Sequence, residues 1–199
     1  MQVTKLAPDF TVSAVMPSGE IINDFNFYEA IEGKYAVLFF YPLDFTFVCP
    51  TEMIALDKRM QAFKDKDTVV ISVSIDSEFS HKHWRDTPIE KGGIGPVNYI
   101  MAADIKHDIC NAYNALHPAE GVALRKSIII DPRKQIRVSM TNDLPVGRNV
   151  DELVRLVDAL QFVDKHGQVC PAGWSEGQAA MQPTETGVAS YLTEHAEQL

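Results

Sequence analysis

The segment YAVLFFYPLDFTFVCPTE, residues 35–52, decides the fold, because it passes from a buried strand through a turn into a helix. Residues 36–41 are all aliphatic or aromatic, which is typical of a strand buried on both faces. Pro50 fits the first turn of a helix, where its missing N–H has no intrahelical partner to lose. We therefore expect Cys49 at the N-terminus of a helix, just beyond a buried strand.

Short apolar runs alternate with amphipathic stretches on either side of this segment. Further strands are predicted at 69–75, 99–101, 126–131 and 135–140, with a turn at 132–134 joining the last two. Helices are predicted at 50–64, 77–85, 104–115 and 150–165. This alternation predicts an α/β fold with a central mixed β-sheet flanked by helices on both faces.

The length of 199 residues is typical of one domain with a substantial core. We expect this domain to span residues 1–165 and residues 166–199 to form an extended C-terminal tail. The tail holds few large apolar residues and cannot build a core alone. It must therefore stay mobile or lie on another surface, which could be that of a second subunit.

The charge and the hydropathy of the chain argue against nucleic acids and membranes as binding partners. The formal net charge is −9, whereas nucleic acids and anionic membranes select a clustered basic face. The apolar runs fall far short of the roughly 20 residues that span a bilayer, and the N-terminus lacks a signal-peptide pattern. We expect a cytoplasmic protein that uses neither nucleic acid nor membrane as a partner.

The three cysteines, Cys49, Cys110 and Cys170, are too few for a disulfide framework and too scattered for a zinc site. Cys110 is expected to pack in the core as a small apolar residue. His81 and His83 are two apart, which on a helix points them to different faces. We expect both histidines in solvent rather than as a metal pair.

Cys49 has the position of a reactive thiol, because unpaired N–H groups and the helix dipole favour a thiolate there. Ionising it near neutral pH takes roughly 3 to 4 kcal/mol, whereas a helix terminus supplies about 0.3 to 1 kcal/mol. A cation is therefore needed, and Arg125 and Arg148 are candidates because each lies at the end of a predicted element. The Thr46 hydroxyl could donate a further hydrogen bond. The alternative is that Cys49 is only a small buried hydrophobic residue.

Two motifs carry a family resemblance. Pro42-x-x-x-Thr46-x-x-Cys49, followed by Pro50-Thr51-Glu52, resembles the active-site signature of peroxiredoxins. Val169-Cys170-Pro171-Ala172-Gly173-Trp174 resembles the resolving-cysteine segment of the typical two-cysteine group, which includes alkyl hydroperoxide reductase C and the thioredoxin peroxidases. The similarity extends over nearly the whole chain.

The resemblance implies a thioredoxin-like fold with Cys49 as the peroxidatic nucleophile and Cys170 of the partner subunit as the resolving cysteine. It also implies supporting roles for five other residues. Pro42, Thr46 and Arg125 would frame the nucleophile, Arg148 would be the second active-site arginine, and Glu52 would orient the arginines.

The same resemblance implies a thiol-specific peroxidase that reduces hydrogen peroxide and organic hydroperoxides without metal, haem or flavin. Thioredoxin or a dedicated flavoprotein reductase would supply electrons, and homodimers would assemble into a decamer. An additional role as holdase chaperone or peroxide sensor stays open, whereas a thioredoxin-like disulfide exchanger is disfavoured because the chain has no CxxC. The tail has Tyr191-Leu192 where overoxidation-sensitive members of the family have Tyr-Phe. Whether Cys49 is sensitive to overoxidation to sulfinic acid therefore stays open.

Overall fold

The structure, a computed structural model, describes residues 3–198 and divides after Val150 into two compact units. The first unit holds the sheet, and the second holds the long helix that follows residue 149 together with the tail. The domain boundary predicted after residue 165 stays a prediction.

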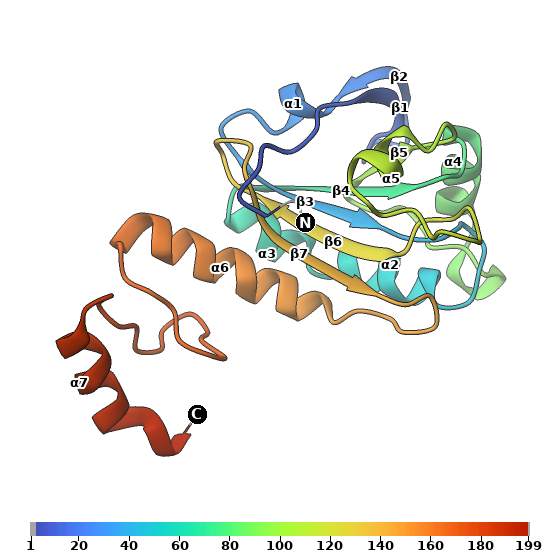
Figure 1. Ribbon diagram of the computed structural model, residues 1–199. Helices are drawn as coiled ribbons and strands as arrows, with labels where there is room; N and C mark the ends of the chain where they lie inside the picture. Colours follow the sequence, from blue (N-terminus) through green and yellow to red (C-terminus); the bar gives the residue numbers. More distant parts are fainter. Residues whose placement is uncertain (1–2, 199) are drawn as a thin grey trace. The chain divides into compact units, whose positions relative to one another are not determined.

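The first unit is built around a seven-stranded sheet (Figure 1). Its strands are Thr11–Val15 (β1), Ile21–Asn26 (β2), Tyr35–Phe40 (β3), Thr68–Ser74 (β4), Ile100–Ala103 (β5), Arg125–Ile130 (β6) and Ile136–Asn142 (β7). Their order is β2-β1-β5-β4-β3-β6-β7. β3 pairs in parallel with β4, and β4 with β5, whereas the other pairs are antiparallel. The sheet is mixed, as predicted.

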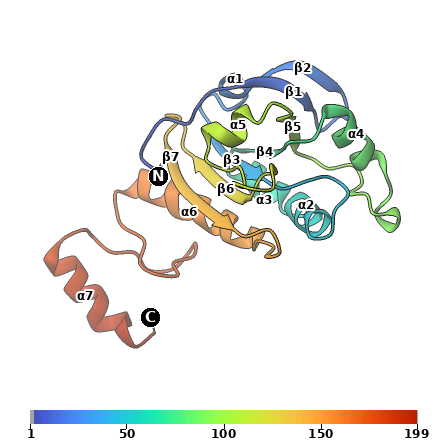
Figure 2. The same cartoon turned by 45° about the vertical axis from the view of Figure 1, so that its right-hand side comes forward.

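Helices cover both faces of this sheet, as predicted. They are Phe27–Ala30 (α1), Cys49–Asp57 (α2), Met60–Asp65 (α3), Glu78–Asp86 (α4) and Asp108–Ala112 (α5), with a short 3-10 turn at Ile89–Lys91. Figures 1 and 2 show α1 and α5 on one side of the sheet and α2 and α3 on the other. Leu38 and Phe40 of β3 pack in one core with Phe27 and Cys110. Cys110 is thus the buried core residue that was expected, and burial raises the pKa of its thiol.

Two helices differ in extent from the prediction. The predicted helix 50–64 is interrupted between α2 and α3, where the Arg59 N–H bonds to the Leu56 carbonyl instead of continuing the α-helical pattern. At this break the Asp57 carboxylate accepts the backbone N–H of Asn98 at 2.6 Å. The predicted helix 104–115 is shorter in the structure, where only α5 is helical. It starts late because His107 has a left-handed φ of 62° and because the Asp104 carboxylate accepts the backbone N–H groups of Ile109 and Cys110 in the first turn of α5.

The second unit contains all of helix Val150–His166 (α6) except its first residue, together with Glu185–His195 (α7) and a 3-10 turn at Ala196–Gln198. α6 begins at the predicted residue and ends one residue beyond the prediction. α7 was not predicted; its N-cap is Thr184, whose side-chain oxygen accepts the Gly187 N–H at 3.0 Å. Among the described helices, none has both the length and the apolar character needed to cross a bilayer.

The expectation that His81 lies in solvent is wrong, because His81 is fully buried on the inner face of α4. Its Nδ1 lies 2.9 Å from Asp44 Oδ2 and its Nε2 lies 3.2 Å from the Ala102 carbonyl. Two acceptors call for a proton on each ring nitrogen. Burial lowers the pKa of His81, but Asp44 raises it by more, so the net shift is upward. His83, on the outer face, is exposed as expected.

We predict that His81→Gln lowers the free energy of unfolding by about 3 kcal/mol, because it removes one partner of a buried ion pair. The pKa of His81 is higher in the folded than in the unfolded protein, so protonation of His81 stabilises the fold. This stabilisation is fully present at pH values below about 6.5, the ordinary histidine pKa, and is lost as pH rises through the folded pKa. The deficit measured in urea titrations should therefore shrink as pH rises above about 6.5. The control His83→Gln should show little change, and a deficit that grows with pH would contradict the assignment.

Candidate active site

Cys49 lies where the sequence places it. It is the first residue of α2, directly after the loop that leaves β3, and Pro50 occupies the first helical turn. Its side chain has no exposed surface, and Pro42 at the start of the loop is buried too. The thiol is therefore shielded from solvent at the positive end of a helix. A negative charge on its sulfur would be stabilised by the helix dipole and by protein groups in contact with it, not by water.

One carboxylate organises the site. Glu52, one helical turn after Cys49, accepts Arg125 Nη1 at 2.7 Å on Oε2. It also accepts three N–H groups of Arg148: the backbone N and Nε on Oε1, both at 2.8 Å, and Nη2 on Oε2 at 3.1 Å. Burial raises the pKa of Glu52, but Arg148 and Arg125 lower it by more. The carboxylate is thus held ionised between two guanidinium groups.

Arg125 is the cation that reaches the sulfur. Its Nη1 lies 3.4 Å from Cys49 Sγ, and its Nε donates to the Leu144 carbonyl at 2.6 Å. Two guanidinium charges and one carboxylate leave a net positive charge of one beside the thiol. This charge adds to the positive end of the helix dipole at the same sulfur.

Arg148 has a supporting place in the same cluster. Its guanidinium carbon lies 3.3 Å from the centroid of the Phe39 ring, and its Nη1 donates to the Lys126 carbonyl and to Ser127 Oγ. With these contacts and its bonds to Glu52, Arg148 ties the first turn of α2 to the strands β3 and β6. Of the two candidate cations, Arg125 contacts the thiol and Arg148 holds the carboxylate.

Thr46 differs from the expectation. Its hydroxyl donates to the Leu43 carbonyl at 2.8 Å, so its single proton is used within the loop rather than on the thiolate. The oxygen keeps acceptor capacity, and rotation about one bond would redirect the proton.

The groups that fix the loop before Cys49 were not predicted from the sequence. Asp44 is bound to His81, and its backbone N–H donates to Asp76 Oδ2 at 2.9 Å. Phe45 has a left-handed φ of 52°, which is strained for a bulky residue, and packs on the rings of His83 and Trp84. No local pattern signals these two pairs, because His81 and Asp76 lie more than thirty residues from Asp44 in the sequence.

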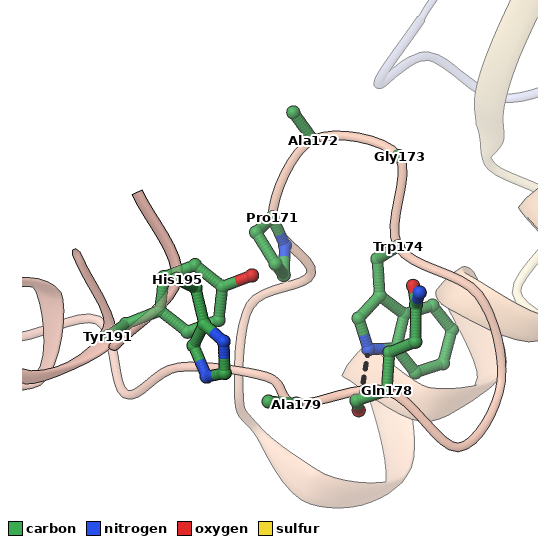
Figure 3. A pocket seen from close by; sticks show the side chains of 8 residues that line it. All are labelled: Pro171, Ala172, Gly173, Trp174, Gln178, Ala179, Tyr191 and His195. Atoms are coloured by element: carbon green, nitrogen blue, oxygen red, sulfur yellow. Dashed lines mark hydrogen bonds between the residues drawn. The ribbon is translucent and has the colours of Figure 1, made fainter. Parts of the chain in front are cut away.

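Cys170 belongs to the second unit and is half-buried. Its Sγ lies 3.7 Å from the Ala159 carbonyl of α6, and the next residues lead to the buried Trp174. Figure 3 shows this turn and the hydrogen bond from Trp174 Nε1 to the Gln178 carbonyl, 3.1 Å long. The pairing of Cys49 with Cys170 stays a prediction.

We predict that Arg125→Lys slows alkylation of Cys49 at neutral pH by about tenfold, because lysine cannot bond the sulfur, Glu52 and Leu144 together. Peptide mass spectrometry after timed iodoacetamide treatment would give the rate for Cys49 separately from the other thiols. The matched control is Arg133→Lys, a mostly exposed arginine. Equal rates in wild type and Arg125→Lys would mean that Arg125 does not activate the thiol.

Comparison with known proteins agrees with this geometry. The model of the AhpC/TSA family matches residues 3–139, and that of the C-terminal domain of 1-Cys peroxiredoxin matches residues 159–194. Alkyl hydroperoxide reductase C of Helicobacter pylori strain ATCC 700392 / 26695 is 50% identical over 199 residues, which is 100% of both chains. Peroxiredoxin-1 of Gekko japonicus is 46% identical, covering 97% of this chain and 96% of its own.

A solved structure is similar over the same length. Reduced Plasmodium vivax 2-Cys peroxiredoxin superposes with a TM-score of 0.93 at 42% identity, covering 97% of this chain and 99% of that one. The thioredoxin-like fold expected from the resemblance is therefore confirmed. The chain belongs to the AhpC/TSA family of peroxiredoxins and is a peroxidase enzyme.

Proposed function

We propose that the chain is a two-cysteine thiol peroxidase that reduces hydrogen peroxide and organic hydroperoxides through a sulfenic acid on Cys49. The observation that carries this proposal is the 3.4 Å contact from Arg125 Nη1 to a fully buried thiol, with Glu52 bridging a second arginine. Such a cluster stabilises negative charge on sulfur and on an oxygen bound beside it.

In the first step the Cys49 thiolate attacks the terminal peroxide oxygen. The O–O bond breaks, the sulfur is oxidised to sulfenic acid, and the other oxygen takes a proton and leaves as water or alcohol. Arg125 would stabilise the thiolate and the developing oxyanion, and Arg148 would keep Glu52 in place. The Thr46 hydroxyl, turned from Leu43, would donate to a peroxide oxygen, and Pro42 would shield the site from water.

In the second step the Cys170 thiol of the partner subunit condenses with the sulfenic acid. A disulfide forms and water leaves. Large apolar side chains are available for such an assembly: Phe47 is 92% exposed and Phe79 70% exposed, and an interface between subunits would bury them. We propose a homodimer that assembles further into a decamer.

The disulfide must be reduced by an external dithiol through thiol exchange, either thioredoxin or a dedicated flavoprotein disulfide reductase. We place the protein in the cytoplasm, where thiols are kept reduced, with a role in antioxidant defence and redox homeostasis. A chaperone or sensor function would be additional to peroxide turnover.

We predict that reduced wild-type protein, treated with one molar equivalent of hydrogen peroxide, migrates as a disulfide-linked dimer on a non-reducing gel. Cys49→Ser and Cys170→Ser should both stay monomeric, because each lacks one sulfur of the intersubunit bond. Cys110→Ser is the control and should behave as wild type.

Other outcomes would correct specific parts of the proposal. Monomers that have lost two thiols would place resolution within one chain, and wild type with no thiol lost would exclude Cys49 as the peroxidatic residue. Protection of a client protein from aggregation that persists in Cys49→Ser, while peroxide turnover vanishes, would establish the additional chaperone role.

A further inference from the structure

One face of α6 binds the segment that carries Cys170, entirely within the second unit. Arg155, Ala159 and Phe162 follow one another at helical spacing along this face. Arg155 Nη1 donates to the Trp174 carbonyl at 2.6 Å, Cys170 Sγ lies 3.7 Å from the Ala159 carbonyl, and the ring of Phe162 lies 4.9 Å from that of Trp174. Cys170 and Trp174 are thus bound by residues that lie one helical turn apart on α6, Ala159 and Arg155.

The Arg155 side chain is fixed in this position by Glu152. Its Nε lies 2.6 Å from Glu152 Oε2 and its Nη2 lies 2.7 Å from Oε1, a bidentate pair on one helix. This pair sets the guanidinium plane and leaves Nη1 for Trp174. The positive charge therefore has a defined place beside the Cys170 segment, although the side chain is partly exposed.

Other titratable groups surround the same segment. Figure 3 shows Tyr191 and His195 of α7 beside Pro171, lining a pocket with the turn that holds Trp174. On the α6 side the charged or titratable neighbours of this segment are Glu152, Arg155, Asp158, Lys165 and His166, with Glu176 from the tail. Burial raises the pKa of the Cys170 thiol, and the charge that opposes this rise is that of Arg155.

We propose that Arg155 is a positioning residue for disulfide formation: held by Glu152 and bound to the Trp174 carbonyl, it keeps a positive charge at the segment that carries Cys170 and favours the thiolate of that residue. The proposal rests on the function proposed above. In the condensation the Cys170 thiolate attacks the sulfenic sulfur of Cys49, the S–O bond breaks, and the oxygen leaves as water after taking a proton. The same charge would stabilise Cys170 as the leaving thiolate when an external dithiol, itself oxidised, opens the disulfide.

A first experiment tests Arg155 without peroxide chemistry. Three full-length proteins that all carry Cys49→Ser are compared: one with no further change, one with Arg155→Met and one with Arg155→Lys. The rate at which Cys170 is alkylated is measured in each as a function of pH. Arg155→Met should move the midpoint up by about one pH unit, and Arg155→Lys should move it less, because the charge remains. The matched control Lys165→Met removes a positive charge from the same helix and should leave the midpoint in place.

A second experiment follows the reaction itself with Cys49 present. In stopped-flow measurements at about pH 7, Arg155→Met should form sulfenic acid at the wild-type rate but the disulfide about tenfold more slowly, and this difference should close at high pH. An unchanged alkylation profile would overturn the inference, as would a slowing that is equal at all pH values, which indicates only a loosened fold. If wild type itself forms no disulfide, the proposed function fails, while the alkylation profile still decides the role of Arg155.

Discussion

The active site depends on a single buried carboxylate, that of Glu52. Two guanidinium groups are packed within a few ångströms of each other next to a thiol, and each would pay a large desolvation cost alone. Glu52 accepts four N–H groups from Arg125 and Arg148 and so makes the pair of like charges tolerable. The same bonds tie α2 to β6 and to the loop after β7, so the chemistry of the site and the packing of the sheet share one interaction.

Much of this arrangement follows from local sequence. The run at 36–41 predicts a buried central strand, Pro50 predicts the helix start at Cys49, and the position of Arg125 at a strand end predicts a cation near the thiol. Each of these signals acts over a few residues. The strands β1 and β2 were not predicted, because their short pattern is weak and they are completed by pairing: β1 pairs with β5, and β2 pairs with β1 at the sheet edge.

What the sequence does not signal depends on contacts between distant segments. From its sequence context His81 is predicted to be a surface residue. It is buried because the fold places it against Asp44, which is 37 positions away in the sequence. The end of α2 is another case, since Asn98 binds Asp57 from a distant loop. Which of Arg125 and Arg148 touches the sulfur was likewise undecided, because both lie at element ends. Contacts between distant segments separate them: Arg125 reaches Cys49 Sγ, and Arg148 packs on Phe39.

The break between α2 and α3 links turnover to local unfolding. Cys49 has no exposed surface, so its sulfur can meet a second sulfur only if the first turn of α2 opens. A nine-residue helix is too short to persist without its tertiary contacts, and the interruption after Asp57 lets it melt while α3 stays on the sheet. In the proposed mechanism, the free energy of that small opening would set how long the oxidised sulfur stays inside the protein, and a mutation that made α2 more stable would slow disulfide formation.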